Sequence, residues 1–159
     1  MDVLHFMKEE YLTIRSQSLG LLPCDLAESI SENDLLSFMG HLDLMLRVGD
    51  ELIISELTDA QSRHLTIGTH AEVQSAELQR FLITFKRSKT VPVSKREDLF
   101  NKISRHIDYM EQFVLPIIRE MIPTATREEI GEIAVDYRHE AGALLSNRSK
   151  GRAGSTISA

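Results

Sequence analysis

Cysteine, glycine, proline and tryptophan are scarce in this chain. Of its 159 residues, 1 is cysteine, 8 are glycine, 4 are proline and none is tryptophan. The single cysteine, Cys24, excludes an intramolecular disulfide framework and a zinc site built from several cysteines. No apolar run reaches the ~20 residues of a membrane span, and no basic-then-apolar leader opens the chain. The sequence therefore predicts a soluble, cytoplasmic domain with no membrane partner.

Positive charge is also in deficit, because 18 Lys and Arg residues face 24 Asp and Glu residues, which gives a formal net charge of −6. An acidic chain argues against nucleic acid as the main partner, since binding to nucleic acid rests on neutralised phosphates. Hydrophobic residues make up 42 % of the chain, enough for a core. We expect a single domain over residues 1–145. Residues 146–159 contain three basic residues and no acid, and this composition predicts a flexible basic tail.

The spacing of apolar residues is helical nearly throughout, and no stretch alternates apolar and polar residues for long. Capping-box patterns begin at Thr58, Ser94 and Thr126 and mark three helix starts. Short connections between long helices favour antiparallel neighbours, so the expected fold is all-α: an up-and-down four-helix bundle with one additional helix. Pro116 should kink the fourth helix, because proline removes a backbone donor. The five predicted helices cover residues 2–19, 33–57, 59–87, 95–122 and 126–145.

The helical period predicts the core-facing residues of each helix. They are Val3, Met7, Tyr11 and Ile14 in the first helix, Leu35, Met39, Leu42, Leu46 and Ile53 in the second, and Leu99, Ile103, Met110, Ile117 and Met121 in the fourth. The same period indicates which polar side chains face the core. Glu10 falls inside the apolar face of the first helix, where a carboxylate must be paired, protonated or bound to a cation. In the third helix His64 lies near the core line and His70 lies on its flank. In the fourth helix His106 lies well inside the core line, with Glu111 at the edge of the same arc.

Imidazole and carboxylate groups that converge from several helices suit iron, manganese or zinc. We therefore predict a metal site for one or two ions, with Glu10, His64, His70, His106 and Glu111 as candidate ligands. The alternative is a closed hydrogen-bond network, because any buried polar group needs a partner. In the last helix, His139 points almost directly away from the side that faces the core.

The segment 106–116, HIDYMEQFVLP, resembles the signature of hemerythrin-like, or HHE cation-binding, domains. That signature is a histidine, an acid five residues later and an apolar run that closes with proline, and His106, Glu111 and Pro116 hold these places. The first helix is similar to a related ferritin-like group of bundle proteins. The resemblance implies a four-helix bundle that holds one or two non-haem iron ions and binds or senses oxygen or another small diatomic, or handles iron.

The segments that contain His70 and His139 also resemble the family's helices. Gln74 and Ala143 stand four residues after these histidines, where a second ligand would be sought. A reduced mononuclear site, or a relic without metal, therefore stays open beside a complete di-iron centre.

Three functions compete on this evidence. The first is a metal-binding bundle that senses, binds or stores. The second is a metal-free interaction module whose acidic surface and basic tail bind a protein partner. The third, a di-iron enzyme, ranks last because the paired Glu-x-x-His motifs of such enzymes are missing, and whether the chain is an enzyme stays open. Apolar residues on helix flanks, such as Leu12, Leu44 and Val48, favour a homodimer.

Overall fold

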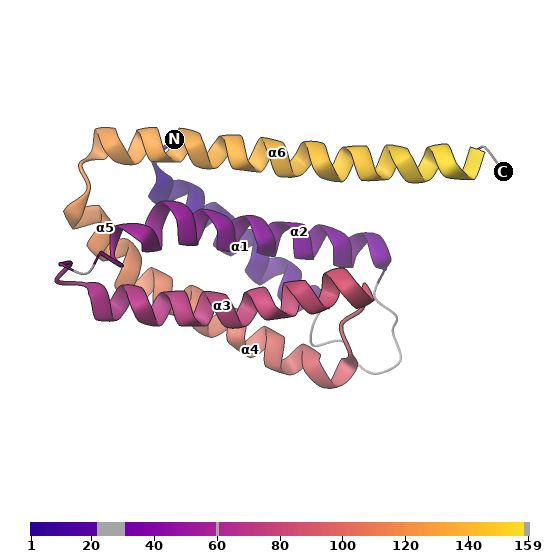
Figure 1. Cartoon of the computed structure of the whole chain (residues 1–159), viewed down its shortest axis with the longest axis horizontal. Helices are drawn as coiled ribbons and strands as arrows, with labels where there is room; N and C mark the ends of the chain where they lie inside the picture. The colour runs from indigo at the N-terminus through magenta and orange to yellow at the C-terminus, as the bar shows by residue number, and fades with distance from the viewer. Residues whose placement is uncertain (22–30, 60, 158–159) are drawn as a thin grey trace.

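The computed structural model describes the backbone of residues 1–21, 31–59 and 61–157, and side chains within those ranges as far as residue 142. Its described part is all-α and contains no strand, as predicted. Five helical rods run through it (Figure 1). They are α1 (Val3–Leu21); α2 (Glu32–Val48), continued by η1 (Gly49–Ile53) and η2 (Ile54–Glu56); α3 (Leu65–Ser88); α4 (Val93–Tyr109), continued by η3 (Met110–Val114) into α5 (Leu115–Met121); and α6 (Thr124–Ile157).

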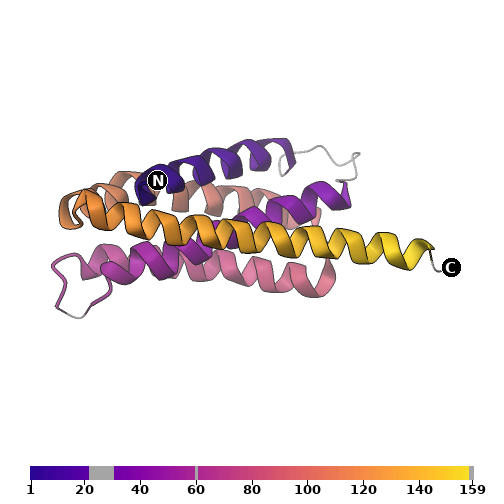
Figure 2. The ribbon, with the colours of Figure 1, turned by 90° about the horizontal axis from the view of Figure 1, so that it is seen from above.

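Helix α2 lies in the middle of the arrangement and packs against α1, α3 and α6, while α3 also packs against α4. The long helix α6 lies along α1 and α2, and its C-terminal end extends past the ends of the other helices (Figures 1 and 2). The backbone stays helical to Ile157, through most of the segment 146–159 that the sequence predicts as a flexible tail. That segment has no proline to stop the helix, and the helix continues through Gly151 and Gly154.

The core residues of α1 confirm the prediction from periodicity. Val3, Met7, Tyr11 and Ile14 are each at most 1 % exposed. The five core residues predicted for the second helix are also buried, namely Leu35, Met39, Leu42, Leu46 and Ile53. A period of 3.6 residues is therefore enough to identify the inward faces of these two helices.

In the fourth rod the predicted core line is correct only up to η3. Met121 was expected to face inward and is 43 % exposed, whereas Ile118 is completely buried. The reason is that η3 is a π-helical turn, which accommodates an extra residue and rotates every later side chain. Pro116 follows directly at the start of α5, where its missing N–H is tolerated, so the proline disturbs the helix as expected but through a π-turn.

The predicted start of the third helix at residue 59 is wrong, because α3 begins at Leu65. The side chain of Asp59 accepts a hydrogen bond from the backbone N–H of Gln61, 3.1 Å away, and Ser62 Oγ accepts one from the N–H of His64 at 3.1 Å. These local bonds stabilise a turn in place of the helix, since short polar side chains compete with the helical ladder.

The expectation of an exposed flank on the second helix is also wrong. Leu44 is 3 % exposed and Val48 is fully buried, because α2 is covered by three neighbouring helices. Leu12, by contrast, is 69 % exposed on α1. The apolar flank of α2 therefore gives no support for a homodimer, because this helix is buried within the chain itself.

Close contact between α6 and the N-terminus depends on Gly131. A Cβ at this position would lie 1.7 Å from the carbonyl oxygen of Met1 and 2.9 Å from the backbone nitrogen of Val3. We expect Gly131→Ala to destabilise the fold by about 1–3 kcal/mol, because backbone atoms must move to make room. The matched control is Gly142→Ala on the same helix, where a Cβ meets no atom of the described residues within 4 Å. Thermal unfolding should show a lower Tm for the first variant only, and equal Tm values would contradict the close contact.

Candidate functional site

A chain of hydrogen bonds joins two histidines across α3 and α4. His106, near the end of α4, is 3 % exposed, and its Nδ1 lies 3.1 Å from Oε1 of Gln74 on α3. The Nε2 of Gln74 lies 3.3 Å from Nε2 of His70, one turn earlier on α3. Because an amide oxygen only accepts, His106 Nδ1 carries a hydrogen and donates it. Gln74 in turn donates to His70, so both rings take the Nδ1–H form in this network.

Burial keeps His106 neutral. Removal from water lowers the pKa of His106 to about 4, and the nearby His70 adds to the decrease. An imidazole that is neutral at pH 7 and protonated at Nδ1 keeps the lone pair of Nε2 for a hydrogen bond or a metal ion. A hydrogen bond at one ring nitrogen that orients the other is also the usual arrangement of metal-binding histidines.

A row of ring contacts connects this hydrogen-bond network to the molecular surface. The rings of His70 and Tyr109 lie 4.5 Å apart between centroids, and those of Tyr109 and Phe113 lie 5.0 Å apart. His70 is exposed and Phe113 is 47 % exposed, so the row opens to solvent. The buried His106 is therefore linked through one amide to a histidine that solvent reaches.

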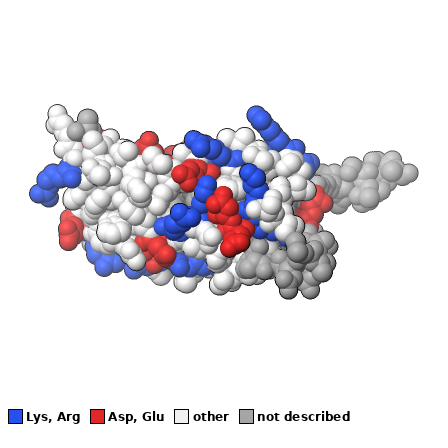
Figure 3. Space-filling view, turned by 90° about the horizontal axis from the view of Figure 1, so that it is seen from below, with Lys and Arg blue, Asp and Glu red and all other residues white. Residues whose placement is uncertain are grey.

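The two carboxylate candidates, Glu111 in the fourth rod and Glu10 in α1, each form an ion pair with an arginine. Glu111, in η3, lies 3.1 Å from Nη2 of Arg15, which also contacts Asp108 at 2.8 Å. Glu10 is 3 % exposed, as predicted, and its Oε1 lies 2.9 Å from Nη2 of Arg138 on α6. Both carboxylates are thus held in ion pairs with arginine. On the face in Figure 3, basic and acidic side chains alternate over part of the surface.

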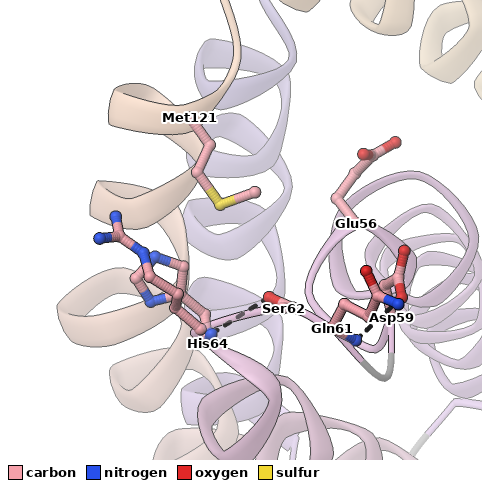
Figure 4. A pocket seen from close by; sticks show the side chains of 7 residues that line it. Glu56, Asp59, Gln61, Ser62, His64 and Met121 are labelled. Carbon is pink, nitrogen blue, oxygen red and sulfur yellow. Dashed lines mark hydrogen bonds between the residues drawn. The ribbon is translucent and has the colours of Figure 1, made fainter.

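His64 lies apart from the histidine pair. It is the residue before α3 and lines a pocket of about 370 Å³ between the turn that follows η2 and the end of α5 (Figure 4). Neither His70 nor His106 lines this pocket. The remaining lining residues are Glu56, Asp59, Gln61, Ser62, Arg63 and Met121.

Of the five predicted ligands, the structure links only His70 and His106, through Gln74. Among the described residues, no group of three or more His, Cys, Asp or Glu side chains is arranged to hold a metal ion. A metal centre made from all five residues therefore stays a prediction, and its carboxylates would have to exchange their arginines for the ion.

A second polar cluster, which the helical period did not predict, lies between η1 and α3. Asp50 lies in the π-helical turn η1. Its carboxylate accepts one hydrogen bond from Ser75 Oγ at 2.9 Å and another from Gln79, and both donors are on α3. Burial raises the pKa of Asp50, and these two hydrogen bonds oppose the rise. The available signal was the place of Asp50 near the core side of an otherwise apolar helix.

The buried hydroxyl of Tyr11 is a second polar feature of the core that the helical period could not predict. Its side chain is 1 % exposed, and its hydroxyl has no hydrogen-bond partner in the described part of the chain. Burial raises the pKa of the Tyr11 hydroxyl, with a further contribution from the charge of Glu111. The hydroxyl is therefore a neutral donor within the core.

We expect His106→Ala to destabilise the protein by about 2–4 kcal/mol, because it leaves a cavity and an unpaired Gln74. His139→Ala is the control, since His139 is an exposed residue of α6. It should change the free energy of unfolding by no more than about 0.5 kcal/mol. Denaturant unfolding of both variants measures the difference, and the opposite ranking would mean that His139 has the structural role.

The neutral state of His106 also predicts a pH dependence. Its folded pKa of about 4 lies below the ordinary 6.5, so the unfolded chain binds the proton more tightly between these values. The contribution of this group is fully present above pH 6.5 and is lost as the pH falls towards 4, by up to ~3 kcal/mol. His106→Gln should flatten the stability profile in this window, measured by unfolding at a series of pH values. An unchanged slope would contradict the burial of a neutral imidazole.

Across the described ranges, no helix is both long enough and apolar enough to cross a membrane. Comparison of the chain with protein-family models, curated proteins and solved structures finds no match in any of the three.

Proposed function

We propose that this chain is a hemerythrin-like helical bundle that binds a transition-metal ion, with non-haem iron as the first choice and manganese or zinc as alternatives. The observation that carries the proposal is the hydrogen bond from His106 Nδ1 to Gln74, at 3.1 Å. It leaves Nε2 of a neutral, buried imidazole available to a cation. The sequence resemblance in segment 106–116 supports the same assignment.

The residues that would hold the ion are His106, His70 and Glu111. Imidazole nitrogen with carboxylate oxygen is a donor set that iron, manganese and zinc accept. His70 reaches solvent and Glu111 is 41 % exposed at its side chain, so both can rearrange without disturbing the core. When bound, iron would supply the ability to bind a small diatomic ligand, which suits sensing or storage.

The proposed setting is the cytoplasm, where a chain with one cysteine needs no disulfide. A homodimer is part of the proposal and now rests on α1, where Leu12 is 69 % and Leu19 63 % exposed. These two residues are seven apart and share one face of the helix.

A metal-free interaction module is the second candidate, and the arginine pairs favour it. Glu10 and Glu111 already have cationic partners in Arg138 and Arg15. A buried carboxylate that is paired and hydrogen-bonded has no need of a metal ion. In this case the polar core residues stabilise the fold, and the acidic surface and basic C-terminal segment recognise a protein.

Metal content separates the two candidates. We expect protein purified without chelator to contain about 0.5–2 transition-metal ions per chain, because Nε2 of the neutral, buried His106 offers a nitrogen ligand at pH 7. Elemental analysis measures the content, and thermal unfolding with and without a strong chelator at pH 7 measures its effect. A Tm that falls by several degrees after chelation supports coordination, since a bound ion stabilises the folded state.

The control is the double variant His70→Ala, His106→Ala, which should take up less metal than wild type. Protein that contains no transition metal and takes up neither iron, manganese nor zinc would favour the interaction module.

A further inference from the structure

Two buried polar atoms face each other between α1 and α2, and neither has a hydrogen-bond partner among the described residues. They are Oε2 of Glu10 and Nδ1 of His41, and 3.6 Å separates them. Glu10 is 3 % exposed, and a carboxylate oxygen at such depth is costly to leave unpaired. The separation exceeds the 2.7–3.2 Å typical of an N–H···O hydrogen bond. A group that contacts both atoms would satisfy both.

The rest of the cluster leaves this side of Glu10 open. Arg138 directs both Nε and Nη2 at the other oxygen, Oε1, at 3.0 Å and 2.9 Å. Its guanidinium also lies over the ring of Phe6, 4.2 Å from the centroid, which fixes it on that side. The geometry thus divides the carboxylate into one oxygen that arginine occupies and one that is available.

The local charge permits a cation at the available oxygen. Glu9 and Glu10 carry two negative charges, and Arg138 contacts both with one positive charge. His5 pairs with Glu9 at 3.2 Å on the exposed side of α1. With neutral histidines the cluster keeps one negative charge in excess, so the arginine does not cancel the attraction for a divalent ion.

We propose that Glu10 Oε2 and His41 Nδ1 form a Zn²⁺ site that joins α1 to α2, separate from the histidine pair of α3 and α4. Zinc bonds to carboxylate oxygen and imidazole nitrogen are about 2.0–2.2 Å long, and two such bonds span 3.6 Å at an angle of about 110–130°. The side chain of His41 is 35 % exposed although Nδ1 itself is buried, so an ion that enters from the exposed side of this ring would complete its coordination with water. A site with two protein ligands and water exchanges its ion.

The test is calorimetric titration of Zn²⁺ into chelator-treated, full-length protein. His41→Ala should bind one fewer zinc ion per chain than wild type, and the partly exposed position of His41 keeps the fold intact. His139→Ala, with its exposed histidine on α6, should bind as many ions as wild type. The double variant His70→Ala, His106→Ala should keep the ion that His41→Ala loses, which separates this site from the one in the proposed function.

Zinc should also raise the Tm of wild type and of the double variant more than that of His41→Ala, because only a bound ion stabilises the folded state. Glu10→Gln, checked for folding by circular dichroism, should lose the same ion, because a neutral amide is a poor zinc ligand. Equal zinc binding by wild type and His41→Ala overturns the proposal, and so does wild-type protein that binds no zinc.

Discussion

Glu10 is buried where α1, α2 and α6 meet, and its negative charge has to be balanced by a positive one. The packing of α6 on the bundle depends on the arginine that supplies this charge. Arg138 reaches from α6 to Glu10 of α1, and its guanidinium packs on Phe6. Ala134 is the one fully buried apolar residue in the described part of α6, and Ile130, Val135, Tyr137 and Ala141 are partly buried against the core. Polar contacts add to this packing, because Tyr137 donates to Glu51 at 2.6 Å. Loss of the arginine would strand a buried charge, which is far more costly than loss of a surface ion pair.

The same demand for compensation determines which candidate ligands are available to a metal. An arginine and a metal ion compete for the same carboxylate oxygens, and arginine holds one oxygen of Glu10 and one of Glu111. His106 offers a nitrogen without such a competitor, because Gln74 contacts its Nδ1 and leaves the lone pair of Nε2, whereas Nε2 of His70 accepts a hydrogen bond from the same amide. Carboxylates would join a metal at His106 only where one oxygen is free or an exposed arginine leaves.

Periodicity predicted the five rods and the inward direction of Glu10 and His106, because both properties depend on local geometry. It could not predict the partners, since Arg138 lies 128 residues from Glu10. It also could not anticipate the π-turn η3, which moved the core position from Met121 to Ile118. Gln74 looked like a gap in a ligand pattern, and the structure uses it as the bridge of the histidine pair. Each failure occurs where tertiary packing selects one of several arrangements that the local sequence allows.

Three polar sets lie at separate helix contacts of this bundle, and that separation bears on function. One joins α1, α2 and α6 around Glu10, another joins η1 to α3 around Asp50, and the last joins α3 to α4 around His106. No described residue belongs to two of these sets, so the effects of substitutions in the Glu10 set and in the His106 set should be close to additive, whereas the other two sets meet at the adjacent residues Gln74 and Ser75 of α3. A single di-metal centre would instead couple them, because its ions share ligands from all four helices. If substitutions in two sets together reduce the metal content by other than the sum of their separate effects, the sets form one centre. Additive reductions would indicate independent sites.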